Sequence, residues 1–167
     1  MFQNVDPKSL TLNPFSAIGD QWMLITAGTP ERCNTMTASW GGLGVLWGAP
    51  MAICYIRPQR YTKEFVDGNE YFTLSFFPEQ YHPQLSLCGS KSGRDVDKVK
   101  ECGFTVQAAE CGAPYFAEAE LVLVCRKRFA QPMDPDNIPR EIKDKWYPQK
   151  DYHTMYWGEI VEVLQKI

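Results

Sequence analysis

Small hydroxyl side chains recur at every second position of the segment NTMTASWGG, residues 34–42. If this segment is a strand, Thr35, Thr37 and Ser39 share one face, because successive side chains point to opposite faces. Backbone groups and small hydroxyls can hold the polar rim of a heteroaromatic ring, and a neighbouring aromatic such as Trp40 can cover one face of it. Threonine is also common on any partly solvated strand. The segment by itself is therefore compatible with a ring-binding edge and with plain β-structure.

Three positive charges gather in the segment YIRPQRYTKEF, residues 55–65. The pattern predicts that a strand gives way here to a helical start at Tyr61 and Thr62. Free backbone N–H groups at such a start attract anions, and a guanidinium such as that of Arg60 adds charge-assisted hydrogen bonds to phosphate oxygens. A phosphate site and a solvated basic turn fit this segment equally well.

A basic loop with two glycines is expected in CGSKSGRDVDK, residues 88–98. Ser90, Lys91 and Arg94 are the side chains of this loop that could close over a phosphate group. The two aspartates of the same loop can instead neutralise its cations. In that case it is an ordinary surface loop.

His153 is the candidate for acid–base chemistry, because an imidazole with a pKa near ~6.5 can relay a proton or orient a substrate. It lies near the start of an expected strand, where histidines are usually structural. Only a cofactor bound beside it would give it a catalytic role. His82, next to Pro83 in an expected helix, is interpreted as structural.

The elements that must position these residues are mostly strands. Apolar runs and alternating patterns predict strands over residues 21–29, 51–56, 71–77, 119–129 and 152–165, besides the strand within 34–42. Gly158 predicts a bend or bulge in the last of them. Helical signals are short and cover residues 62–66, 78–89 and 136–146, the last with an Asx cap at Asp136. Many strands and few helices favour a closed or partly closed antiparallel barrel, since closure removes exposed sheet edges.

The composition is that of a single globular domain. The chain has 167 residues, of which 44% are hydrophobic and 22% charged. The formal net charge is −3, so there is no general basic field to attract nucleic acid or anionic lipid. Residues 33–56 carry no charge, but glycines and Pro50 interrupt them, which indicates buried β-structure and not a membrane-spanning helix.

The six cysteines form neither a CxxC pair nor a cluster with histidine. A metal site is therefore not expected. The first ten residues, MFQNVDPKSL, lack the basic and then apolar order of a signal peptide. We accordingly expect free thiols and a cytoplasmic location.

Four segments in this order resemble the flavin reductase-like family, the FMN-binding split barrels that include flavoredoxin. The segments are NTMTASWG, RPQRYT followed by YFTLSFF, CGSKSGRDVDK and HTMYWGEIVEV. The resemblance runs over about residues 21–163, the core of one FMN-binding domain expected over 1–167. It implies a mainly β fold, a six-stranded antiparallel Greek-key split barrel with a few short helices, which forms a homodimer with FMN near the subunit interface.

The resemblance also assigns roles to residues by their place in these segments. The isoalloxazine ring would be bordered by Thr35, Thr37, Ala38, Ser39 and Trp40. The FMN phosphate would be held by Arg60, Tyr61 and Thr62. The phosphate or the ribityl chain would also be reached, from the partner subunit if need be, by Ser90, Lys91 and Arg94. His153 would lie near the nicotinamide of NAD(P)H and the flavin.

The implied activity is that of an NAD(P)H-dependent flavin reductase, in which hydride moves to the flavin N5. The alternative is an FMN electron carrier that a protein partner reduces without NAD(P)H, and a third possibility is a barrel without flavin that serves as an interaction domain. Two features lie outside the resemblance. Residues 130–150 match no family motif and are interpreted as a lid or a dimer arm. There is also no GxGxxG fingerprint for a nicotinamide nucleotide.

Overall fold

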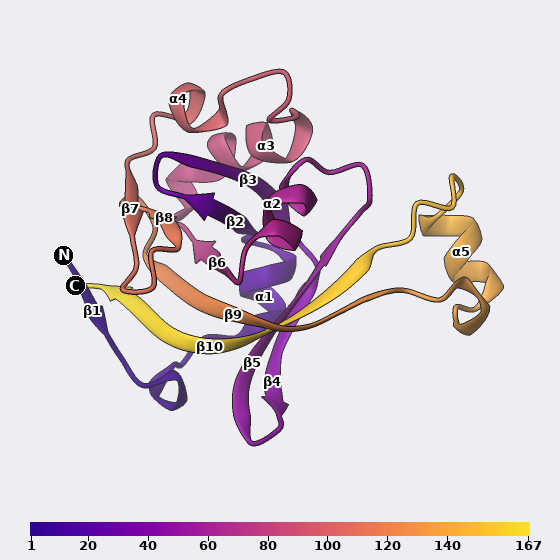
Figure 1. Ribbon diagram of the computed structural model, residues 1–167, viewed down its shortest axis with the longest axis horizontal. Coiled ribbons are helices and arrows are strands. Elements are labelled where there is room, and N and C mark those ends of the chain that lie inside the picture. The colour runs from indigo at the N-terminus through magenta and orange to yellow at the C-terminus, as the bar shows by residue number, and fades with distance from the viewer.

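An antiparallel sheet of eight strands forms the body of the computed structural model, which describes residues 1–167 (Figure 1). The strands lie in the order β3-β2-β6-β9-β10-β5-β4, with β1 paired to β10 beside this path. Their bounds are β1 Phe2–Asn4, β2 Met23–Thr29, β3 Arg32–Ala38, β4 Gly41–Leu46, β5 Ala49–Ile56, β6 Tyr71–Phe76, β9 Leu121–Pro132 and β10 Thr154–Lys166. A separate hairpin pairs β7, Val106–Ala108, with β8, Pro114–Phe116.

The expectation of six strands is wrong, and no closed barrel forms. There are ten strands, and the two end strands of the large sheet, β3 and β4, are not paired with each other. The extra strands β1, β7 and β8 have three residues each, too few for a hydrophobic period to show in the sequence. The predicted strand over 34–42 is also divided: β3 ends at Ala38, so Ser39 and Trp40 lie in the connection to β4.

The remaining predicted strands are confirmed as β2, β5, β6, β9 and β10. The alternation in β6 places Phe72, Leu74 and Phe76 together in the larger of two hydrophobic clusters. The predicted irregularity at Gly158 is confirmed too, because the pairing of β10 with β9 shifts register there. A Cβ at Gly158 would lie 2.6 Å from the ring of Phe72. Only glycine lets β10 cross the core so closely.

Five short α-helices accompany the sheet, and Figure 1 shows α3 and α4 together on one side of it. Their bounds are α1 Pro14–Gly19, α2 Thr62–Gly68, α3 His82–Ser90, α4 Lys98–Cys102 and α5 Arg140–Trp146, and 3₁₀ turns cover Pro7–Ser9, Glu79–Tyr81 and Pro135–Asn137. Pro83 lies in the first turn of α3, where its missing N–H costs nothing. None of these helices combines the length and the apolar character needed to cross a bilayer.

The predicted helix over 136–146 starts later than expected. An aspartate side chain does cap backbone N–H groups here, but it is that of Asp134, which caps the 3₁₀ turn Pro135–Asn137. The α-helix begins only at Arg140, after Pro139. In Figure 1, α5 lies at the end of the molecule opposite the two chain termini.

Candidate functional site

A cavity of about 200 Å³ lies beside the connection between β3 and β4. The end of β3 supplies one wall, β5 and the turn after it supply another, and His153 stands just before β10. Six of the side chains singled out from the sequence meet here: Thr37, Ala38, Ser39, Trp40, Arg60 and His153. The other three lining residues, Met36, Tyr55 and Arg57, were not among the predicted site residues. Residues 36–40 are uncharged, so this wall offers backbone groups and small side chains to a ligand.

A second cavity, of about 490 Å³, adjoins the first and shares Ser39, Trp40 and Tyr55 with it. Its walls are mainly apolar and include residues of α1, of β4 and of the segment before β10. Phe15 of α1 lines it and is 87% exposed. The small polar cavity and the larger apolar one therefore meet at an aromatic wall.

His153 is buried at the back of the small cavity and is held by Tyr147. The Tyr147 hydroxyl oxygen lies 2.7 Å from Nδ1 of His153, and both side chains are less than a tenth exposed. Burial, assisted by the positive charge of Arg57, lowers the pKa of His153 to about 4. The imidazole is therefore neutral at pH 7, and one of its nitrogens must accept a hydrogen bond while the other donates.

The surroundings favour the tautomer with the proton on Nε2. Burial raises the pKa of Tyr147, so its hydroxyl keeps its proton and can donate it. If Nδ1 were the donor instead, the tyrosine proton would have only the Met133 sulfur, 3.6 Å away, as an acceptor. Sulfur is a weak acceptor. We infer that Tyr147 donates to Nδ1, which leaves His153 with a donor at Nε2.

Part of the 130–150 segment packs against residues that line the small cavity of the same chain. Arg57 forms an ion pair with Asp151 at 2.8 Å and donates to the carbonyl oxygen of Trp146 at 3.0 Å. The rings of Trp146 and Trp40 meet edge to face, with centroids 5.0 Å apart. This segment therefore supplies Tyr147 and Trp146 to the site, and its role as a lid stays a prediction. The role as a dimer arm also stays a prediction.

The hydroxyl groups of Thr35 and Thr37 form hydrogen bonds inside the protein. Thr35 is fully buried, donates to the carbonyl oxygen of Ile25 and pairs with the hydroxyl of Thr26 at 2.9 Å. The Thr37 hydroxyl donates to the carbonyl oxygen of Leu85 in α3. Thr37 is therefore turned toward α3, whereas Thr35 is turned toward β2 and does not line the small cavity. Any ring bound there would meet the backbone of residues 36–40 more than these hydroxyls.

Two cations meet at the C-terminal end of α3. Arg60 donates to the carbonyl oxygens of Gly89 at 2.7 Å and Cys88 at 3.3 Å. Lys98 is 4% exposed, and its ammonium donates at 2.8 Å to the carbonyl oxygens of Thr35 and Cys88. Neither cation has a carboxylate partner. A buried charge without a counter-ion is costly, so this cluster would favour an anion.

The electrostatic cost is visible at Lys98. Burial, together with the neighbouring charge of Arg60, lowers the pKa of Lys98 to about 8. Lys98 lies at the end of the predicted basic loop but was not among the predicted site residues. Its signal is weak in the sequence, since a lysine after Asp97 on a short helix looks like any exposed surface lysine.

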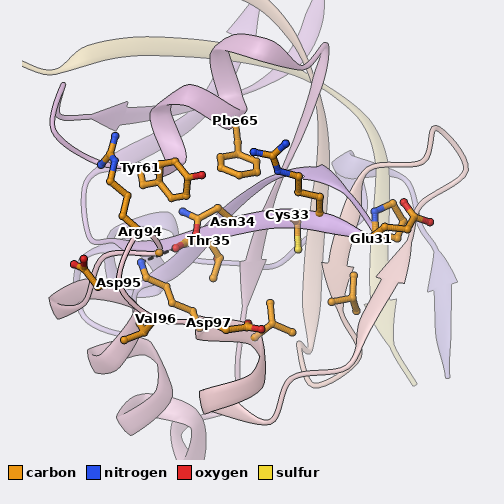
Figure 2. A pocket seen from close by; sticks show the side chains of 16 residues that line it. Glu31, Cys33, Asn34, Thr35, Tyr61, Phe65, Arg94, Asp95, Val96 and Asp97 are labelled. Atoms are coloured by element: carbon orange, nitrogen blue, oxygen red, sulfur yellow. Dashed lines mark hydrogen bonds between the residues drawn. The ribbon is translucent and has the colours of Figure 1, made fainter.

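Three of the remaining predicted residues, Thr35, Tyr61 and Arg94, line a third cavity of about 510 Å³, shown in Figure 2. Tyr61 comes from the residue before α2, and Arg94 comes from the loop that precedes α4. The guanidinium of Arg94 lies 4.6 Å from the centre of the Tyr61 ring and forms an ion pair with Glu64. The loop is thus folded back on α2.

Three predicted residues line none of these cavities: Thr62, Ser90 and Lys91. Thr62 is buried, and its hydroxyl accepts a hydrogen bond from the Asn34 side chain at 2.8 Å. Ser90 and Lys91 are exposed at the end of α3, and Lys91 pairs with no carboxylate. The predicted residues are therefore divided among the cavities, the protein interior and the surface.

Comparison with known proteins identifies the family of this chain. Residues 15–166, almost the whole chain, match the family model of the flavin reductase like domain. The chain belongs to the flavin reductase-like family. The resemblance based on four sequence segments is thereby confirmed. Comparison with the curated proteins finds no match.

Several solved structures share the fold of this flavin reductase-like chain. Flavoredoxin from Methanosarcina acetivorans superposes with a TM-score of 0.70 and 23% identity, covering 87% of this chain and 68% of its own. An FMN-binding protein from Thermus thermophilus with bound p-hydroxybenzaldehyde gives 0.69 and 21%, covering 87% and 71%. Flavoredoxin of Desulfovibrio vulgaris gives 0.68 and 21%, covering 98% and 77%. At these identities the likeness shows a common fold.

Proposed function

We propose that this chain binds FMN and acts as an oxidoreductase that reduces flavin with NAD(P)H. The observation that carries the proposal is the small cavity, in which an uncharged backbone edge, an arginine without a carboxylate partner and a buried neutral histidine face one space. These are the groups that a flat polar ring, an anionic tail and a hydride-transfer partner require. Membership of the flavin reductase-like family adds to the support.

The residues present fit an isoalloxazine ring at the edge formed by residues 36–40. Backbone groups can pair with the ring's alternating donors and acceptors, and Trp40 stands beside the space, with its ring centroid 5.2 Å from that of His153. Cavities that bury a ligand of this size usually measure about 300–1,000 Å³. The small cavity has about 200 Å³, so the ring must extend toward the adjoining apolar cavity.

The anionic tail fits the cationic cluster around Arg60. Arg60 has N–H groups on a rigid planar fork that suits phosphate oxygens. In the present arrangement two of them are used by carbonyl groups of α3. Thr62 accepts from Asn34 and keeps its own proton for a further acceptor. We therefore assign the phosphate to Arg60, Tyr61 and Thr62, with Lys98 as an additional cation nearby.

The bound flavin would supply the hydride chemistry, with N5 as the acceptor. The chain's own part is to position and to exclude water. Because His153 is neutral and carries its proton on Nε2, it would orient a ligand as a hydrogen-bond donor and would not act as a charged acid at pH 7. Trp146 and Tyr147 would shield the same space from solvent.

A homodimer is part of the proposal. The hairpin of β4 and β5 carries Val45 and Trp47 with exposures of 77% and 68%, and β4 is an end strand of the sheet. Exposed apolar groups beside an unpaired strand edge favour association. A second copy could also cover the open side of a cavity that is small for a flavin. Light scattering of the purified protein is expected to give the mass of a dimer, and a monomer at micromolar concentration would disprove this part.

The alternative function is an FMN electron carrier that does not use NAD(P)H. It is favoured by the likeness in fold to two flavoredoxins. The experiment begins with purified protein loaded with FMN and passed through gel filtration, where retained flavin absorbance supports flavin binding. NADH or NADPH is then added without oxygen or any partner protein. Bleaching supports the reductase, whereas bleaching by dithionite alone would favour the carrier.

A further inference from the structure

Two cysteine thiols face each other between α3 and α4. The Sγ atoms of Cys88 and Cys102 are 3.7 Å apart, although 14 positions separate the residues in the chain. Cys88 is fully buried in the second hydrophobic cluster, and Cys102, the last residue of α4, is partly exposed. Among the six cysteines, only these two thiols are within hydrogen-bonding distance of each other. This pair is therefore the place where the chain can form an internal disulfide.

The geometry requires only a small movement. Sulfur atoms in a disulfide are about 2.05 Å apart, compared with 3.7 Å here. Helix α4 has only five residues and ends at Gly103, whose φ of +66° is left-handed. A single short helix shifts more easily than the middle of a strand that is paired on both sides. Cys102 can therefore approach Cys88 without disturbing the large sheet.

We propose that Cys88 and Cys102 are a dithiol–disulfide couple, oxidised by hydrogen peroxide and restored by an external dithiol. The inference does not depend on the proposed flavin activity. It concerns a pair of side chains that the flavin site does not use.

The chemistry starts at Cys102, because it is the thiol that solvent reaches. Its sulfur attacks one peroxide oxygen, so that an S–O bond forms, the O–O bond breaks and water leaves, which gives a sulfenic acid. The sulfur of Cys88 then attacks that of Cys102. The S–S bond forms, the S–O bond breaks, and hydroxide leaves as water with the proton from Cys88. One peroxide is reduced to two waters, and the two thiols lose two electrons and two protons.

Burial of the two thiols determines how fast they are oxidised. It raises the pKa of Cys88 to about 12 and also raises the pKa of Cys102, so both thiols are protonated at neutral pH. Since the thiolate is the nucleophile, oxidation is slow and needs sustained peroxide. The pair then stays reduced under ordinary reducing conditions.

The couple is placed where its state matters for the cationic cluster. The carbonyl oxygen of Cys88 accepts hydrogen bonds from both Arg60 and Lys98. A disulfide ties this residue to the end of α4, the helix in which Lys98 is the first residue. The oxidised form therefore closes a ring that contains the loop with Arg94 and helix α4.

The test treats the full folded chain with an excess of hydrogen peroxide and removes the peroxide. The chain is then unfolded in denaturant, its remaining thiols are blocked with iodoacetamide, and the intact mass and the linked peptides are measured. Expected are two fewer alkylated thiols, a peptide cross-link between Cys88 and Cys102, and full reversal by dithiothreitol. Cys102→Ser should lose the cross-link, and circular dichroism checks that it folds. Cys111→Ser, which changes an exposed unpaired cysteine, should keep it.

Three results would overturn the proposal. The first is a wild-type chain that retains all its alkylatable thiols after prolonged peroxide treatment. The second is oxidation of Cys102 to sulfinic acid without any cross-link. The third is a cross-link between other cysteines, or one that persists in the Cys102→Ser variant.

Discussion

The hydrogen bond between Tyr147 and His153 can be tested by removing one oxygen atom. Tyr147→Phe keeps the buried ring but deletes the hydroxyl that lies 2.7 Å from Nδ1. A typical hydrogen bond contributes about 0.5–1.5 kcal/mol. If this bond sets the tautomer of His153, its loss lowers the ratio of the Nε2–H to the Nδ1–H form by between about twofold and about tenfold, since about 1.4 kcal/mol corresponds to a factor of ten.

The assay is ¹⁵N NMR of the imidazole nitrogens in the protein without added flavin. The chain has two histidines, so a His82→Asn variant assigns both sets of signals. In the wild type, Nε2 of His153 should carry the proton and Nδ1 should not, and Tyr147→Phe should mix the two forms. His82, which stacks on Trp22 at 4.1 Å, serves as an internal control that should not change.

The reasoning fails if the wild-type spectrum shows the proton on Nδ1. It also fails if the spectrum of Tyr147→Phe is identical to that of the wild type. Neither result depends on whether the chain binds FMN, so the tautomer is judged separately from the proposed activity.

The other predictions concern stability and flavin chemistry. The pKa of His153 is about 4 in the folded chain and 6.5 for the free side chain, so acid protonates the unfolded state first. The free energy of unfolding should therefore fall by about 3 kcal/mol between pH 6.5 and 4. Urea titrations of His153→Gln should lack this pH-dependent decrease. Arg60→Ala should weaken FMN binding by roughly 1.5–3 kcal/mol in fluorescence titrations, and unchanged affinity would remove the phosphate assignment. His153→Ala should still bind flavin but be reduced more slowly by NAD(P)H in stopped-flow absorbance, and an unaltered rate would end its catalytic role. Gly93→Ala should lower the free energy of unfolding by about 1–3 kcal/mol in urea titrations, because the new Cβ would overlap the Asn34 side chain. Gly44→Ala, which has open space around it, is the matched control and should change this free energy little.

Local patterns in the sequence were sufficient for most of the sheet. The alternation in residues 71–77 and the apolar runs that became β2, β5 and β9 each reflect one buried face, which is a property of neighbouring residues. The register shift at Gly158 could be expected for the same reason. Three-residue strands such as β1 could not, because their existence depends on a partner strand far along the chain, here β10.

Local sequence patterns predicted only part of the candidate site. The sequence by itself determined the family, since residues 34–41, 57–62, 88–98 and 153–163 carry motifs that resemble it in order, and the family model matches the chain. The tertiary structure decided what each side chain does there. It turned the hydroxyl of Thr35 inward, and it buried Lys98 against a carbonyl 63 positions away. It also brought Tyr147, from a segment without a motif, onto His153. Burial and long-range contacts set hydrogen-bond partners and pKa values, and neither is a property of neighbouring residues alone.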